Sequence, residues 1–144
     1  MAYESITLNQ EIIIDNIVSI HYFEYMSDFS FEGESHDFWE FLCVDKGAVN
    51  VVADTTTYTL NKGDIIFHKP NEFHNVKANN IIAPNLVVIA FECTSPAMDF
   101  FKNKILRVGQ TEQTLLAQII KEARETFSCR LDDPYCEKLT RKEC

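Results

Sequence analysis

Hydrophobic and polar residues alternate in short blocks over the first two thirds of the chain. The blocks are rich in β-branched and aromatic residues, and turn signals such as "DKG" at 45–47 and "NKGD" at 61–64 separate them. No helical pattern of about 10–15 residues lies between them, as a parallel β-α-β sheet would need. The pattern is typical of a sandwich or a barrel. The expected strands span residues 16–25, 37–44, 48–53, 55–60, 64–69, 73–78 and 85–93.

A different spacing begins at residue 95. The segment "SPAMDFFKNKI" at 95–105 starts with serine and proline, which suit an N-cap and the first helical position. The segment 111–127 is the clearest helix of the chain, with Thr111 expected to cap it and Glu112 at the positive end of the helix dipole. Its apolar residues form one stripe, which must pack against the β-domain or another subunit: Leu115, Leu116, Ile119, Ile120, Ala123 and Phe127.

The C-terminal residues 132–144, "DDPYCEKLTRKEC", predict another helix. Asp133 is expected to cap it, and Pro134 suits its first position. Because the chain stops soon after this start, we expect the sequence to be cut from a longer protein.

Length and charge limit the classes of function. The chain has 144 residues, enough for one domain, and 46% of them are hydrophobic. Its 22 acidic and 13 basic residues give a net charge of −9. Binding to nucleic acid needs many Lys and Arg contacts to phosphates, so this chain alone is not expected to bind DNA or an anionic membrane. No stretch approaches the ~20 apolar residues of a membrane span, and "MAYESITLNQ" does not resemble a signal peptide. A cytoplasmic location is expected.

The cysteines agree with that location. No two of them have the C-x-x-C spacing of a zinc ribbon or a redox site. We therefore expect free thiols in a reducing cytosol, with Cys43 packed in the core because it lies in an apolar run. The five cysteines are Cys43, Cys93, Cys129, Cys136 and Cys144.

Polar residues of one parity gather in the segment "ESHDFWEF". Side chains alternate between the two faces of a strand, so Glu34, His36, Phe38 and Glu40 share a face if the strand runs straight through them. If the strand carrying His74 is its neighbour in a small barrel, His36, Glu40 and His74 converge inside it. Two imidazoles and a carboxylate could bind a divalent cation. They could also be polar residues that fill the barrel and bond to each other, and the sequence leaves both interpretations open.

Other residues near these segments have simpler interpretations. Trp39 lies on the opposite strand face and is expected to pack under the helices. His68 is expected on the surface, while His21 lies in a β segment and could face the core or a pocket. Gly63 is expected in a turn, and Pro70 is expected to fix a corner.

Two motifs together resemble the cupin signature, and more closely the ligand-binding domain of AraC-type transcription regulators. The first motif of those domains has the form H-x-H-x-F/Y-x-E-L, and "ESHDFWEF" stands in its place with Glu34 instead of the first histidine. The second, G-D-x-x-x-x-x-P-x-x-x-H, is matched by "GDIIFHKPNEFH" at 63–74. Asn71 replaces the usual glycine after the proline, and asparagine tolerates left-handed backbone angles well. The resemblance covers residues 30 to 127, approximately.

The resemblance implies a mainly β fold, a cupin-like double-stranded β-helix (jelly-roll) barrel over residues 1–94 and a helical dimerisation segment over 95–144. It implies an effector pocket without catalytic residues, metal or cofactor, formed by Glu34, His36, Phe38, Glu40 and His74. In the family a helix-turn-helix DNA-binding domain follows, and it is absent from this sequence.

The expected partners follow from the same resemblance. They are a small-molecule effector such as a sugar or small metabolite, a second copy bound through helix 111–127, and DNA only through the missing domain. Carboxylates in the pocket favour a ligand with hydroxyls or an amine over a strongly anionic one. The alternative function is a small metal-dependent cupin enzyme, an isomerase or dioxygenase, that uses His36, Glu40 and His74.

Overall fold

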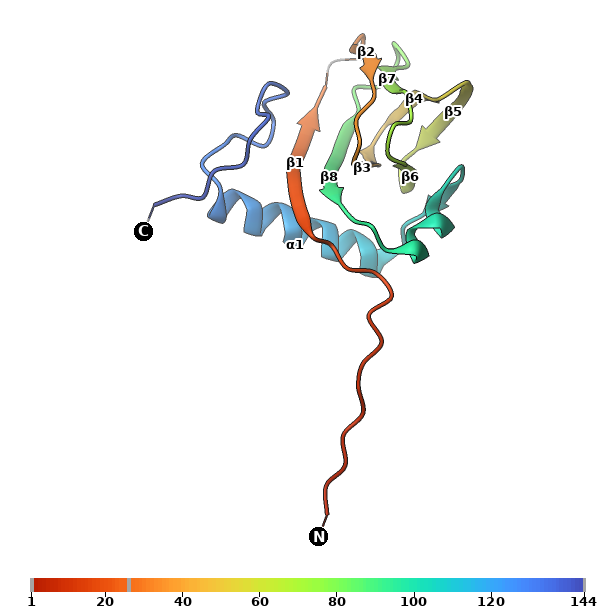
Figure 1. The fold of residues 1–144 in the computed structure, drawn as a ribbon. Coiled ribbons are helices and arrows are strands. Elements are labelled where there is room, and N and C mark those ends of the chain that lie inside the picture. The colour runs from red at the N-terminus through yellow and green to blue at the C-terminus, as the bar shows by residue number, and fades with distance from the viewer. Residues whose placement is uncertain (1, 26, 144) are drawn as a thin grey trace.

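The computed structural model describes residues 2–25 and 27–143, which form two facing antiparallel sheets with one α-helix beneath them (Figure 1). The helical elements are the 3₁₀-helix η1 (Pro96–Phe101) and α1 (Gln110–Thr126). The strands are β1 (Asn16–Glu24), β2 (Ser30–Glu34), β3 (Trp39–Lys46), β4 (Ala48–Ala53), β5 (Thr56–Asn61), β6 (Asp64–His68), β7 (His74–Ala78), β8 (Asn85–Glu92) and β9 (Ile105–Arg107).

The order of the strands defines the fold. The first sheet has the order β1-β8-β3-β6-β9 and the second the order β2-β7-β4-β5, and every pairing is antiparallel. The chain crosses repeatedly from one sheet to the other, and the first and last strands of the barrel, β1 and β8, lie side by side. This is the arrangement of a jelly roll built from two Greek keys. The expected mainly β, cupin-like jelly roll is therefore confirmed.

Each of the seven expected strands is present, with its ends within two residues of the prediction. Two further strands, β2 and β9, were not predicted. The sequence of β2, "SFEGE", shows no apolar alternation because this strand lies at the edge of the second sheet with most of its side chains exposed. The expected helix over 95–105 is wrong beyond Phe101, because the chain leaves η1 and pairs as β9 with β6.

Two hydrophobic clusters lie on opposite faces of the first sheet. One fills the barrel between the sheets and includes Leu42, Val51 and Leu86. The other lies between the first sheet and α1, where Trp39 and Ile120 are buried. Trp39 therefore packs under the helix as expected. The two clusters fix the barrel and α1 to a shared sheet, whose alternate side chains face each of them.

Helix α1 presents only part of its apolar stripe to the sheet. Ile120 and Ala123 are buried, whereas Leu115 and Ile119 are exposed by 52% and 41%. Its N-cap is Gly109 rather than the expected Thr111, and the Gly109 backbone N–H donates to the carboxylate of Glu112 at 3.3 Å. No helix within the described residues is both long enough and apolar enough to cross a membrane.

The expected helix from Asp133 is wrong. The Asp133 carboxylate accepts a hydrogen bond from the backbone N–H of Tyr135 at 2.9 Å, which holds a turn instead. The chain then folds back, and the backbone N–H of Lys142 donates to the carbonyl of Thr126. Residues 128–143 therefore form a closed loop beside β1, at the left of Figure 1.

The same loop contains a disulfide that the sequence analysis did not predict. Cys129 and Cys136 are joined in a disulfide, so the expectation of free thiols is wrong for this pair. The loop closure brings the two side chains together, which their spacing in the sequence did not reveal. Among the described residues, Cys43 and Cys93 form no disulfide, and both are buried, as was expected for Cys43. Cys144 lies outside the described residues.

The contact of α1 with the sheet can be tested by truncating one buried side chain. We expect Ile120→Ala to lower the free energy of unfolding by about 2–5 kcal/mol, because it removes a buried side chain from the cluster between α1 and the first sheet. Ile119→Ala on the exposed side of the helix is the control and should cost less than about 1 kcal/mol. Urea denaturation of both variants measures the difference. Equal losses would show that the stripe is buried on both sides.

Candidate functional site at one end of the barrel

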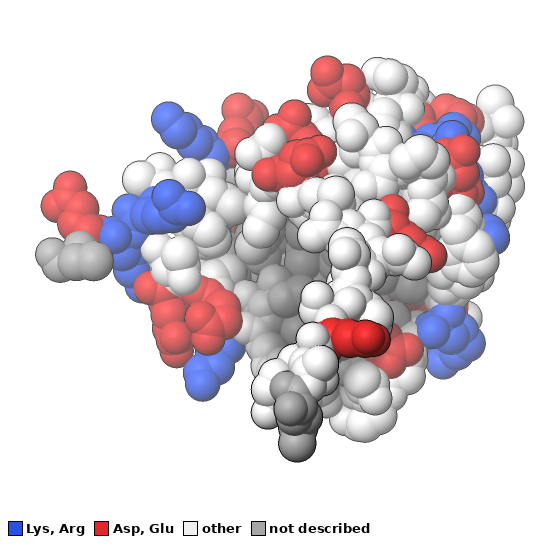
Figure 2. All heavy atoms as spheres, turned by 60° about the horizontal axis from the view of Figure 1, so that its bottom comes forward, with Lys and Arg blue, Asp and Glu red and all other residues white. Residues whose placement is uncertain are grey.

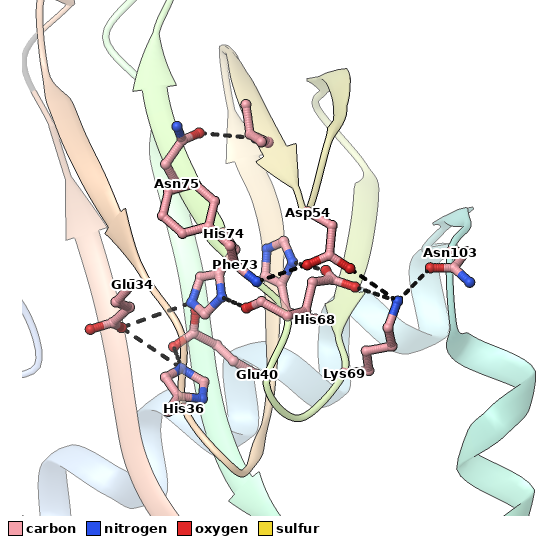
Figure 3. A network of polar contacts seen from close by, with 12 residues as sticks. Glu34, His36, Glu40, Asp54, His68, Lys69, Phe73, His74, Asn75 and Asn103 are labelled. Atoms are coloured by element: carbon pink, nitrogen blue, oxygen red, sulfur yellow. Dashed lines mark hydrogen bonds and ion pairs between the residues drawn. The ribbon is translucent and has the colours of Figure 1, made fainter.

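Four polar residues meet where the two sheets approach at one end of the barrel (Figure 3). Glu34 is the last residue of β2, His74 is the first residue of β7, and the two are paired in register in the second sheet. Glu40 lies on β3 of the first sheet, and His36 lies in the turn that joins β2 to β3. The strand that would run straight from 34 to 42 is therefore absent. The parity explanation was wrong, although the predicted residues do converge.

The ligand atoms of these four residues lie within 4.8 Å of one another. The Nε2 atom of His36 lies 3.7 Å from Glu34 and 3.6 Å from Glu40. The Nε2 atom of His74 lies 3.8 Å from Glu34 and 3.0 Å from Glu40. Each imidazole thus faces both carboxylates. We call these residues the four-residue cluster.

Both histidines are oriented by backbone carbonyls. The Nδ1–H of His36 donates to the carbonyl of Phe38 at 3.0 Å, and the Nδ1–H of His74 donates to the carbonyl of Glu72 at 3.0 Å. A carbonyl only accepts, so Nδ1 of each ring carries a hydrogen. Nε2 is then a second N–H donor when the ring is protonated, and offers a lone pair when the ring is neutral. Both Nε2 atoms are buried, and within residues 2–25 and 27–143 neither has a hydrogen-bond partner other than the facing carboxylates. They are directed at the carboxylates at ion-pair distances.

The charge of the cluster is set by Glu40. Burial raises the pKa of its carboxyl, but interactions with His36 and His74 outweigh burial and lower that pKa to about 2. Burial likewise lowers the pKa of each histidine, and the interaction with Glu40 outweighs it, so both pKa values are raised. Glu40 is therefore ionised at neutral pH, and the cluster attracts positive charge.

The donor set fits a divalent metal ion. Two imidazole nitrogens and two carboxylates suit first-row transition metals. A backbone carbonyl bonded to the opposite ring nitrogen is the usual support of a metal-ligating histidine. Among the residues that the structure describes, both Nε2 atoms have no partner other than the facing carboxylates. Glu34, His36, Glu40 and His74 would hold the ion. A bound ion would act as a Lewis acid on a ligand oxygen.

The side chain of Phe38 packs against the cluster through its aromatic ring. Its half-buried ring stacks on that of His36, with ring centroids 3.9 Å apart and planes inclined by 6°. This contact and the carbonyl of Phe38 together fix the plane of His36. The predicted site residues are therefore all brought together: four form the cluster and Phe38 packs against it.

A second polar group behind His74 was not predicted. His68 was expected on the surface, but only 1% of it is exposed and its Nδ1 lies 2.8 Å from the buried carboxylate of Glu72. Glu72 also contacts the ammonium of Lys69 at 3.1 Å, and the His68 ring stacks on that of His74. The sequence contained evidence for this burial, because His68 lies two residues after the buried Ile66 and therefore points to the same face of β6.

The turn between β6 and β7 positions Glu72 and His74. Asn71 has a φ of 67°, so the residue that replaces glycine does adopt the left-handed conformation expected of it. Its backbone N–H donates to the carbonyl of His36 at 2.6 Å, which joins the two turns that carry the histidines. Gly63 has a φ of 91° in the preceding turn, as expected for a turn glycine.

Removal of Glu72 tests this support. We expect Glu72→Ala to destabilise the protein by about 1–3 kcal/mol, because it leaves the buried His68 ring without its hydrogen-bond partner. Glu32→Ala on an exposed position of β2 is the control and should change stability by about 0.5 kcal/mol or less. Chemical denaturation measures both. A small loss for Glu72→Ala would show that His68 needs no carboxylate.

Metal binding at the cluster can be measured directly with Co²⁺. We expect one Co²⁺ to bind per chain and His74→Ala to weaken binding about tenfold or more, because a buried ligand is lost. His21→Ala is the matched control, since His21 lies outside the cluster, and it should bind as the wild type does. Calorimetry and visible absorption report binding. Unchanged binding by His74→Ala would place the ion elsewhere.

Comparison with known proteins gives one match of sequence and several of fold. No curated protein matches the chain significantly. The cupin domain of Cnp3 from Schizosaccharomyces pombe is 12% identical, with a TM-score of 0.49 over 65% of this chain and 70% of that one. An RmlC-like cupin from Shewanella frigidimarina is 17% identical, with a TM-score of 0.45 over 65% and 74%. Neither likeness carries any inference about function.

The family match covers the strands that form the cluster. Residues 16–80 match the family model of the AraC-like ligand binding domain, and this range includes Glu34, His36, Glu40 and His74. The jelly-roll order of the strands agrees with it. Residues 16–80 are therefore similar to the AraC-like ligand binding domain, within a chain that folds as a jelly roll.

Proposed function

We propose that this chain is the effector-sensing and dimerisation part of an AraC-type bacterial transcription regulator in the cytoplasm. The observation that carries the proposal is the four-residue cluster at the barrel end, inside the range that matches the AraC-like ligand binding domain. A small molecule bound there would control a DNA-binding domain that lies outside this sequence. The acidic charge of the chain, −9, agrees with DNA contacts made elsewhere.

The cluster favours a ligand that donates hydrogen bonds. The Nδ1–H groups of both histidines are already used by carbonyls, so the acceptors offered to a ligand are the carboxylates of Glu34 and Glu40. A hydroxyl or an amine supplies the donors. A dicarboxylate would be repelled by Glu34 and Glu40.

Helix α1 supports the dimerisation part of the proposal. Leu115 and Ile119 are exposed on a face of the helix that does not meet the sheet. Two copies of this face packed about a two-fold axis would bury both side chains. Such a dimer would present two DNA-binding domains to paired half-sites.

A metal-dependent cupin enzyme is the second candidate, and the fit of the cluster to a divalent ion favours it. The two candidates differ in how the ion is held. An enzyme should retain stoichiometric Fe, Mn, Ni or Zn through purification, whereas a sensor of organic ligands should not. Elemental analysis of the purified chain separates them, and stoichiometric metal would contradict the sensor.

Ligand binding tests the sensor directly. In a thermal-shift screen of sugars, polyols, amines and dicarboxylates, we expect a hydroxyl-rich compound or an amine to raise the melting temperature. Glu40→Gln should remove that shift, because it replaces the buried charge of the cluster. Glu32→Gln, on an exposed position of β2, should keep it. A dicarboxylate as the sole binder would contradict the expected ligand class.

The dimer is tested at Ile119. We expect the wild type to dimerise at high concentration and Ile119→Glu to be monomeric, because a charge on the exposed stripe opposes burial. Ile120 is unsuited to this test, since it is buried against the sheet. Light scattering gives the mass, and Gln118→Glu on the same helix is the control. A dimer that survives Ile119→Glu would place the interface elsewhere, most simply on an edge strand.

A further inference from the structure

Two adjoining cavities lie outside the barrel, along α1. The first, of about 590 Å³, lies between α1 and the first sheet. The second, of about 600 Å³, lies between the end of α1, β1 and the C-terminal loop. Tyr22, Glu24 and Arg124 line both. We call this continuous space the α1 trench. It shares no lining residue with the four-residue cluster.

The first cavity has an apolar floor and an apolar wall. Cys43 and Val87, from adjacent central strands of the first sheet, form part of the floor. Leu116, Ala117 and Ile120 of α1 form the wall. Its volume lies within the roughly 300–1,000 Å³ typical of small-molecule pockets. An aromatic or aliphatic group would fit between the helix and the sheet.

The trench differs in charge from the rest of the chain. Five of the 13 basic residues line it, but only four of the 22 acidic ones do. Figure 2 shows basic and acidic side chains side by side near the C-terminal end of the chain. The basic residues of the trench are Lys62, Lys121, Arg124, Arg130 and Lys142, and the acidic ones are Glu24, Asp45, Glu125 and Asp132.

Some of these charges already have partners. Asp45 accepts a hydrogen bond from the Tyr22 hydroxyl at 2.7 Å, and Asp132 pairs with Arg130 at 2.8 Å. The ammonium of Lys142 donates to a backbone carbonyl of α1 at 2.7 Å.

Among the described trench side chains without a partner, the basic residues outnumber the acidic ones. Within residues 2–25 and 27–143, the side chains of Lys62, Lys121 and Arg124 have no carboxylate within ion-pair distance. Glu24 and Glu125 are likewise unpaired, so the cations outnumber the carboxylates by one in a protein whose net charge is −9.

Arg124 is placed to bind an anion. Its guanidinium lies 5.9 Å from the centre of the Tyr22 ring, where the two cavities meet. A guanidinium held over an aromatic face still presents its N–H fork to a carboxylate or sulfonate. A ligand anchored there could place an apolar body along the wall of α1.

We propose that the α1 trench is a second ligand site, which takes a small organic anion with an aromatic or aliphatic body. The acid group binds Arg124, and the apolar body lies between Ala117 and the floor of the trench. Because one wall is α1, the bound molecule contacts the helix and the barrel at once. The site is independent of the four-residue cluster, and its ligand class is opposite in charge.

Two fluorescent probes of similar shape test the proposal. The anionic probe is 1-anilinonaphthalene-8-sulfonate, and the neutral one is N-phenyl-1-naphthylamine. We expect Arg124→Gln to weaken binding of the anionic probe about tenfold or more, because a charge-assisted contact is lost, and to leave binding of the neutral probe unchanged. Arg141→Gln is the control, since Arg141 does not line the trench. Equal binding of the anionic probe by Arg124→Gln and wild type would overturn the proposal.

A second pair of variants tests the place of the apolar body. Ala117→Trp fills the trench from an exposed helix position and should abolish binding of both probes. Gln118→Trp adds the same ring outside the trench and should leave both unchanged. Circular dichroism melting confirms that both variants fold. Probe binding that persists in folded Ala117→Trp would mean that the probes bind elsewhere on exposed apolar surface, and would overturn the site.

Discussion

A buried, ionised carboxylate at the end of the barrel constrains much of the surrounding structure. Only 14% of the Glu40 side chain is exposed, yet its low pKa keeps it charged. A buried charge is costly unless it is paired, and here two imidazoles face it. Those imidazoles must be held with Nε2 inward, which requires an acceptor for each Nδ1–H. The turns before β3 and β7 supply these acceptors as the carbonyls of Phe38 and Glu72.

The same constraint explains the second polar group. Glu72 supplies its carbonyl to His74 and its carboxylate to His68, and its other oxygen contacts Lys69. Lys69 in turn donates to Asn103 at 2.8 Å, in the segment between η1 and β9 (Figure 3). The barrel end is thus joined by a chain of polar contacts to the segment that leads to α1. A change of charge at the cluster would act first on His74 and on the two residues that contact it, Glu72 and His68.

Helix α1 has three distinct faces. Ala123 faces the first sheet, Ala117 and Arg124 face the trench, and Leu115 and Ile119 remain exposed. Ile120 lies between the first two faces and contributes to both. An amphipathic helix needs only one apolar stripe to pack on a sheet. The wider stripe of α1 leaves room for a second apolar contact, and the trench separates the helix from part of the sheet. Both features make the helix the element through which binding at one place could affect another.

Local sequence determined most of the strands and the main helix, because alternation and helical periodicity are set by which side chains must leave water. Its motifs also indicated that Glu34, His36, Glu40 and His74 belong together, and the structure brings these four side chains close to one another. Local sequence could not determine how they meet, since Glu34 and Glu40 come from opposite sheets and only the jelly-roll crossings bring them together. Tertiary structure likewise decided the burial of His68, the loop from 128 to 143 and the pairing of Cys129 with Cys136. These features depend on contacts between residues distant in sequence or on chain reversal, and neither appears in a local pattern of hydrophobic and polar residues.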